Sequence, residues 1–319
     1  MRLNAKTKEN TVRISVQNRG QHLFKQLKRC RMLYLMILPG LLATFIFCYL
    51  PMGGAVIAFK DYSSRLGIWG SKWVGLKHFK RFLEYPYFAK IFLNTIRISL
   101  VSLCISFPAA IIFSLMLNEM KNKKLKKICQ QITYAPYFIS TVVVCSMTIL
   151  FLNRSGIVNI VITKLGGEAI DLMSNPTVFP YIYAISGLWS GLGWSTILYL
   201  ASLSGVSVEL LEAAKIDGAG RFGVIWHVTL PHLKPTIMTL LILNLGSLLG
   251  VGFEKVLLLQ NSLNMEASSV ISTYSYEVGI IQQQLSYSTA IGLFNNFVNV
   301  IFVCAANLLS KKLTEVGLW

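Results

Sequence analysis

Residues 209–235 read ELLEAAKIDGAGRFGVIWHVTLPHLKP, a stretch of mixed polarity that separates two long apolar runs. A first short helix is predicted from about Val208 to Ile216. The residues 217–220, Asp-Gly-Ala-Gly, should break it, because glycine readily adopts the conformations that end helices. A second short helix is predicted from about Arg221 to Val228. The link 204–235 therefore reads as a pair of short helices.

Apolar runs that are long enough to cross a membrane lie on both sides of this link. The chain is 54% hydrophobic and 13% charged, whereas a soluble domain carries about 25% charged residues. A run of about 20 apolar residues spans the hydrocarbon as one helix. Leu230-Pro231 is expected to end the second short helix, and Pro235 to begin the next span. The predicted fold class is an all-α integral membrane protein with spans at about 33–59, 92–117, 131–152, 179–201, 236–259 and 288–309.

The distribution of Lys and Arg predicts which links face the cytoplasm. Six spans place both termini on one side, and the segments on that side hold 19 Lys plus Arg, against 9 on the other. Basic residues collect in cytoplasmic loops. The prediction is a basic cytoplasmic segment at 1–31, a membrane domain at 32–310 and a cytoplasmic tail at 311–319. The link 204–235 is then cytoplasmic as well.

The link resembles the EAA loop, the cytoplasmic signature of permease subunits in binding-protein-dependent ABC importers. That pattern is E-A-A, three residues, G, nine residues, I, one residue, L-P, and here Val228 replaces the isoleucine. Val208 stands where a proline is common. The residues to which the resemblance assigns coupling to an ATPase are Glu212, Ala213, Ala214, Asp217, Gly218, Ala219, Phe222, Leu230 and Pro231.

The resemblance implies the type I ABC importer permease fold, with six transmembrane helices and a mechanical role for the loop. In that family the first short helix docks in a cleft of the ATPase and moves when two ATPases close on ATP. The small residues Ala213 and Ala214 permit close approach, and Glu212 can pair with basic groups. The chain has no G-x-x-x-x-G-K-[ST] motif. We therefore expect a transport subunit, not an enzyme, that binds no cofactor, with ATP and Mg²⁺ on a separate ATPase chain.

The C-terminal third resembles one branch of the family, the permeases for complex oligosaccharides, which include pectin-fragment and alginate importers. The resemblance implies import of an oligosaccharide through the bacterial inner membrane. It also implies a second, different permease, two ATPase subunits and an extracytoplasmic solute-binding protein as partners. The basic outer segment 60–90 leaves room for an anionic sugar, although packing against lipid headgroups explains it equally well. The stretches that carry this likeness are Phe253–Leu259, Thr273–Tyr276, Tyr287–Phe294 and Glu315–Trp319.

A few polar residues inside the predicted spans are candidates for the substrate path. Glu254 and Lys255 fall late in the predicted fifth span, and charge inside a membrane usually faces a cavity. An interfacial position that reaches water explains them as well. Asn295, Asn296 and Asn299 in the sixth span can hydrogen-bond sugar hydroxyls or, more commonly, neighbouring helices.

Other classes of function fit the sequence less well. A self-sufficient secondary carrier or channel is the alternative, but carriers commonly show inverted repeats and several intramembrane acids. This chain has one plausible intramembrane acid. The histidines show no H-E-x-x-H spacing for a metal, and no catalytic constellation suggests a membrane enzyme. The net charge of +17 does not form a basic stripe interleaved with aromatics, which excludes nucleic acid as the partner.

Overall fold

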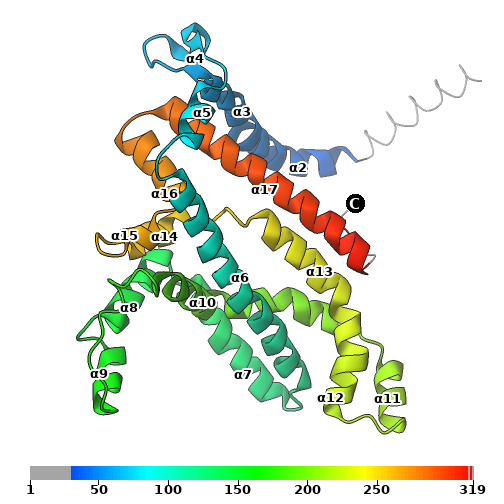
Figure 1. Ribbon diagram of the computed structural model, residues 1–319. Helices are drawn as coiled ribbons and strands as arrows, with labels where there is room; N and C mark the ends of the chain where they lie inside the picture. Colours follow the sequence, from blue (N-terminus) through cyan, green and yellow to red (C-terminus); the bar gives the residue numbers. More distant parts are fainter. Residues whose placement is uncertain (1–29, 315–316, 318–319) are drawn as a thin grey trace, which may run out of the picture. The chain divides into compact units, whose positions relative to one another are not determined.

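Helices make up most of the computed structural model, which describes residues 30–314 and Gly317 (Figure 1). The chain divides into two compact units, Met1–Val56 and Ile57–Trp319. Five helical stretches among the described residues are long and apolar enough to cross a membrane. A sixth is present if two helices joined at a bend of 78° count as one span. This confirms the predicted all-α membrane protein. The predicted basic segment 1–31 and the tail 311–319 lie mostly outside the described residues.

The first unit is a single apolar helical path. It consists of α2 (Arg31–Thr44), a π-helical turn (Phe45–Tyr49) and α3 (Leu50–Met52), and it continues as a 3₁₀ helix (Gly53–Phe59) into the second unit. Arg31–Phe59 qualifies as a membrane span, and none of its apolar window is buried by the protein. A helix that is hydrophobic on all sides suits lipid. This stretch corresponds to the span predicted at 33–59.

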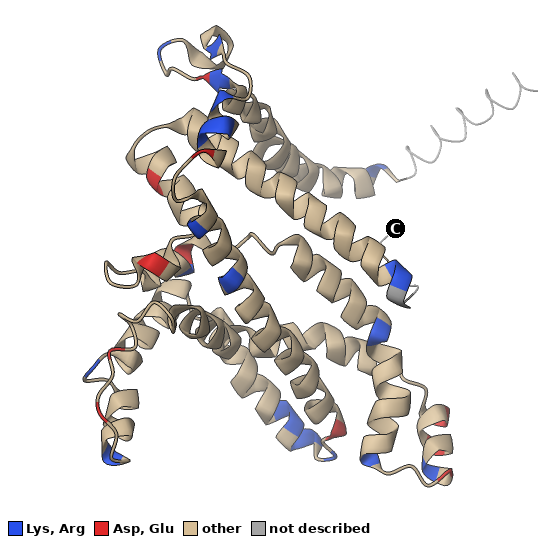
Figure 2. Cartoon of the chain, in the orientation of Figure 1, with Lys and Arg blue, Asp and Glu red and all other residues tan. Residues whose placement is uncertain are grey.

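The scaffold of the second unit consists of four long helices. The helices α6 (Phe88–Glu119) and α10 (Phe179–Leu203) pack along each other, and α13 (Leu230–Gly246) packs against α10 and α17 (Leu285–Thr314). Figure 2 shows that most charged residues lie at helix ends and in links, while α10 carries none. The spans predicted at 92–117, 179–201 and 288–309 correspond to α6, α10 and α17.

A small folded segment precedes α6. It contains the antiparallel strands β1 (Lys60–Asp61) and β2 (Lys72–Trp73), with α4 (Gly67–Gly70) between them, and then α5 (Lys77–Leu83). The Phe82 ring on α5 is fully buried among aromatic rings, and these contacts fix α5 to α17. Its ring partners are Phe88, Tyr274, Tyr287 and Phe294.

The third span is not the single helix predicted at 131–152. The chain forms α7 (Lys123–Tyr134), a 3₁₀ turn (Ala135–Phe138) and then α8 (Thr141–Leu152), which α9 (Ile157–Lys164) follows. Pro136 lacks the N–H that a continuous helix would need. Ser140 starts the new helix, because its side chain accepts a hydrogen bond from the backbone N of Val143 at 3.4 Å.

The span predicted at 236–259 is also interrupted. Helix α13 begins earlier, at Leu230, and ends at Gly246, and the short α14 (Phe253–Leu259) starts after a non-helical stretch. Side chains from other helices form hydrogen bonds with the backbone of this stretch. Ser99 donates to the carbonyl of Leu248, Asn299 accepts from the backbone N of Leu249 at 3.0 Å, and the Tyr183 hydroxyl accepts from Gly252 N at 3.1 Å. Irregular backbone at membrane depth is tolerated where protein groups satisfy it or where it lines a cavity.

Three short elements connect α14 to α17. These are α15 (Met265–Ser268), α16 (Ile271–Tyr276) and a π-helical turn (Glu277–Ile281). The buried Asn264 side chain donates to the carbonyls of Met173 at 3.0 Å and Leu259 at 3.1 Å, which joins this region to the loop before α10.

Candidate functional site

The link between α10 and α13 starts with the helix that the sequence predicts. Helix α11 runs over Val208–Ile216, and the side chain of its N-cap, Ser207, accepts a hydrogen bond from the backbone N of Leu210 at 3.5 Å. The helix is bent by 78° relative to α10. It therefore turns away from the direction of the span before it.

Gly218 ends α11 in a left-handed backbone conformation, with φ at +80°. The backbone N of Ala219 donates to the carbonyl of Ala214 at 2.9 Å, and Gly218 N donates to the carbonyl of Lys215 at 3.1 Å. This pair of bonds is the Schellman arrangement, which favours glycine at that position. The helix break predicted at residues 217–220 is confirmed.

The second short helix continues into the next span, contrary to the prediction. Helix α12 (Arg221–Val224) runs through a π-helical turn (Ile225–Thr229) directly into α13. Leu230-Pro231 therefore does not end a helix, and Pro235 lies inside α13. The Pro231 ring would crowd the carbonyl four residues earlier in an α-helix. The π-helical turn before it widens the backbone at that point, with Leu230 N donating to the carbonyl of Ile225.

The link presents large apolar side chains to its surroundings. Ile216 is 85% exposed and Phe222 is 88% exposed, and Val208, Leu210 and Trp226 are exposed as well. Glu212, Ala213 and Asp217 are also exposed, whereas Ala214, Ala219 and Leu230 are half-buried. Exposed apolar residues that cluster in this way are typical of a surface that contacts another protein.

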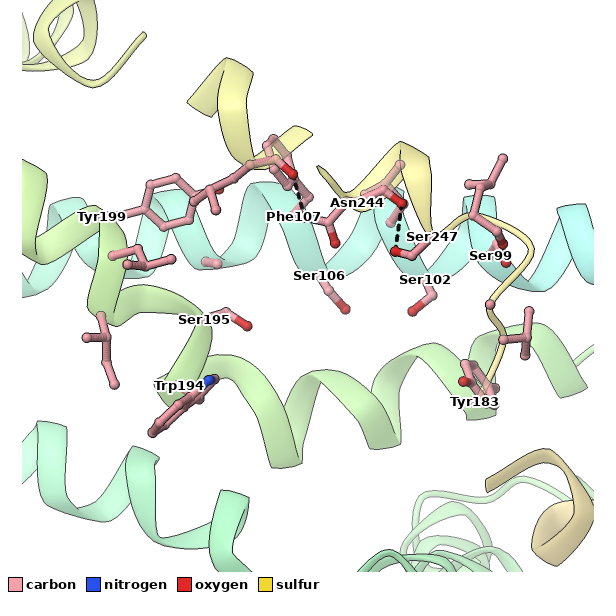
Figure 3. Close-up of a pocket in the computed structure, with 18 residues that line it drawn as sticks. Ser99, Ser102, Ser106, Phe107, Tyr183, Trp194, Ser195, Tyr199, Asn244 and Ser247 are labelled. Carbon is pink, nitrogen blue, oxygen red and sulfur yellow. Dashed lines mark hydrogen bonds between the residues drawn. The ribbon is translucent and has the colours of Figure 1, made fainter. Parts of the chain in front are cut away.

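A cavity of about 520 Å³, with several hydroxyl groups in its lining, lies between α6, α10 and α13 (Figure 3). The hydroxyls of Ser102 and Ser106 on α6 and of Ser195 on α10 point into the space between these helices. The interrupted stretch after α13 forms another part of the lining, through Ser247, Leu248, Gly250 and Val251. The irregular backbone therefore serves to shape the cavity.

The lining suits a molecule with many hydroxyl groups. A serine hydroxyl both donates and accepts hydrogen bonds, and an amide does the same with two separate atoms. Aromatic side chains of Phe107, Tyr183, Trp194 and Tyr199 complete the lining beside Asn244. Binding sites commonly combine such apolar walls with a few polar groups that fix orientation. The sequence contains a signal for this site, because Ser99, Ser102 and Ser106 have the spacing of one helix face. These serines were not among the residues predicted for the substrate path.

A second cavity of about 400 Å³ adjoins the first, and Lys255 lines it. The two cavities share Ser102, Ser106, Tyr183 and Ser195. Lys255 lies in the first turn of α14, after the helix break, and not late in a continuous fifth span. The adjacent Glu254, which was also predicted for the substrate path, is exposed and lines neither cavity.

The three asparagines predicted for the substrate path take different positions on α17. Asn299 bonds the interrupted backbone at Leu249 and so joins two parts of the fold. Asn296 is exposed. Asn295 is half-buried, and its side-chain oxygen has no hydrogen-bond partner among the residues that the structure describes. Neither cavity between α6 and α10 includes any of the three.

Comparison with known proteins gives consistent matches over most of the chain. The family model for the binding-protein-dependent transport system inner membrane component matches residues 106–315. Protein LplB of Bacillus subtilis (strain 168) is 45% identical over 294 residues, which is 92% of each chain. The polygalacturonan/rhamnogalacturonan transport system permease protein YteP of the same organism is 44% identical over 307 residues, 93% of this chain and 96% of the relative.

A solved structure agrees with these relatives. It is a chain of a bacterial ABC transporter involved in the import of the acidic polysaccharide alginate, with a TM-score of 0.83 and 37% identity. The match covers 92% of this chain and 99% of that one. The same transporter in complex with an alginate pentasaccharide-bound periplasmic protein also gives a TM-score of 0.83 and 37% identity, over 93% and 99% of the two chains.

Proposed function

The chain belongs to the family of binding-protein-dependent transport system inner membrane components, and we propose that its cavity between α6, α10 and α13 is part of the path for an imported oligosaccharide. Family membership confirms the resemblance that residues 204–235 indicated. It makes the chain a permease subunit of an ABC importer in the inner membrane.

The hydroxyl-lined cavity is the observation that carries the proposed cargo. Serines of two long helices face one another across it, and aromatic rings flank them (Figure 3). Sugars combine hydroxyl groups with apolar ring faces, so both kinds of lining have a counterpart on an oligosaccharide. Two of the similar proteins are named for transport of polygalacturonan or alginate, both of which are polysaccharides, and this supports the class of cargo.

The link 204–235 is the proposed contact with an ATPase. Helix α11 would dock on the ATPase, and its exposed apolar residues would be covered there. The full assembly would contain a second permease subunit, two ATPase subunits and an extracytoplasmic solute-binding protein. ATP and Mg²⁺ would bind to the ATPase subunits. This chain would transmit their closure to its spans through the direct helical connection from α12 to α13.

The proposed orientation places the link, and both termini, in the cytoplasm. Five lysines within residues 121–127 lie between α6 and α8, on the side assigned to the cytoplasm. Green fluorescent protein fused after Trp319 should therefore fluoresce in cells. The same fusion would stay dark on the outer side, because this protein folds poorly when it is exported unfolded. A dark fusion together with an active alkaline phosphatase fusion at the same site would contradict the orientation.

Transport in vesicles tests the proposed function and separates it from a secondary carrier. The assembled transporter would be reconstituted with its binding protein, and uptake of labelled trigalacturonate would be measured with ionophores present. ATP-dependent uptake that persists with ion gradients collapsed supports the proposal. Uptake that needs an ion gradient and ignores ATP would instead support a carrier.

A further inference from the structure

Lys255 places a cation beside the hydroxyl-lined cavity. Its side chain extends from α14 to α10, where the ammonium donates a hydrogen bond to the backbone oxygen of Tyr183 at 2.7 Å. The same ammonium lies 4.4 Å from the centroid of the Tyr183 ring. An ammonium has three N–H donors, and one hydrogen bond from it is found among the described residues.

The charge of Lys255 has no carboxylate partner in the part of the chain that the structure describes. The ion pairs found there involve Asp61, Glu84 and Glu266, with basic residues other than Lys255. The adjacent Glu254 is exposed. A charge away from bulk water is costly unless it is paired, and inside a membrane protein it commonly faces a cavity or a substrate path. An anion that enters the cavity would supply the negative charge that pairs with Lys255.

The opposite wall leaves space for this ammonium. A Cβ atom built on Gly187 of α10 would lie 2.8 Å from Nζ of Lys255. A side chain at this position would therefore force the ammonium to shift. Both residues line the cavity, together with Ser190 and Ser195. The cation is thus held at a defined place among hydroxyl groups.

We propose that Lys255 binds a carboxylate of the cargo, so that the transported oligosaccharide is a uronate. A carboxylate in this cavity would accept hydrogen bonds from the remaining N–H groups of Lys255, and the serine hydroxyls would form hydrogen bonds with the ring hydroxyls of the same sugar. This inference rests on the proposed function, because it assigns a chemical class to the cargo of the same cavity.

Equilibrium binding to the assembled transporter tests this inference. The probes are trigalacturonate and its fully methyl-esterified form, which has the same rings and linkages without the charge. We expect the wild type to bind the acid at least tenfold more tightly than the ester. Lys255→Met should abolish this preference. Lys164→Met, at the exposed end of α9, removes one positive charge at a distant position. This variant should keep the preference for the acid.

Gly187→Ala provides a second variant that leaves the net charge unchanged. Displacement of the ammonium should reduce the preference for the acid even if Lys255→Met fails to assemble. Equal binding of the two probes by the wild type, or an unchanged preference in Lys255→Met, would overturn the inference. This result differs from a failure of the proposed function. If the chain did not import oligosaccharides, vesicles with the wild type would accumulate neither probe upon addition of ATP.

Discussion

The side-chain oxygen of Asn299 accepts a hydrogen bond at 3.0 Å from the backbone N of Leu249, fifty positions earlier in the chain. Leu249 is fully buried and lies where the fifth span is interrupted. The bond replaces one that a continuous helix would have made. It therefore helps to keep open the irregular stretch that lines the cavity.

Replacing Asn299 by Leu should destabilise the permease. The change leaves the buried N–H of Leu249 without a partner, which costs about 1–3 kcal/mol. We expect a lower apparent melting temperature of the purified transporter in detergent. Asn296→Leu is the matched control, because this side chain is exposed on the same helix. Equal melting temperatures for the two variants would contradict the role of Asn299.

Gly218→Ala should impair coupling between ATP hydrolysis and uptake. A Cβ atom at φ +80° costs about 1–2 kcal/mol, and relief of this strain would change the angle between α11 and α12. The measurement is the number of ATP molecules hydrolysed per oligosaccharide imported, which should rise. Gly223→Ala lies in α12, where a Cβ atom meets an ordinary contact of 3.5 Å. That control should couple normally, and similar behaviour of both variants would be evidence against the turn.

Phe222→Ala should weaken the attachment of the ATPase without affecting the fold of the permease. The ring is 88% exposed, so its removal costs little within the chain, whereas aromatic residues in interfaces often carry about 2 kcal/mol or more. We expect less ATPase to co-purify with the permease. Leu165→Ala is a suitable control, because this residue is 83% exposed next to α9. Full retention of ATPase by Phe222→Ala would exclude this residue from the contact.

Gly193→Ala should disturb the packing of α10 against α7. A Cβ atom there would overlap the backbone of Thr133 and the ring of Tyr134. Overpacking of this kind costs about 1–3 kcal/mol. The melting temperature should fall, while Gly191→Ala, where nothing lies within 4 Å, should leave it unchanged. A stable Gly193→Ala protein would mean that the two helices can separate at little cost.

Local signals in the sequence were sufficient to predict the first helix of the link 204–235. Ser207 and Gly218 mark the ends of α11 through bonds to residues close in the chain, so the predicted bounds agree with the structure. The interruption after Gly246 depends on distant side chains, Ser99, Tyr183 and Asn299. Hydropathy does not distinguish a helix from an irregular stretch that such side chains satisfy. The fifth span was therefore predicted as continuous.

The cavity could not be predicted from local sequence signals either. Its serines come from helices far apart in sequence, and only the packing of α6 against α10 brings Ser102 and Ser195 to opposite sides of one space. The predicted path residue Lys255 lies beside this space for a reason that the sequence does not reveal. The helix break turns its side chain toward Tyr183.

Filling the cavity tests most directly whether it is the path of the cargo. Ser195→Phe should reduce ATP-dependent uptake of labelled trigalacturonate at least tenfold, because the ring would occupy space between α6 and α10. Ser204→Phe, an exposed position just after α10, should transport normally, and both variants should retain their ATPase. Uptake at the wild-type rate by an assembled Ser195→Phe transporter would show that the oligosaccharide crosses elsewhere.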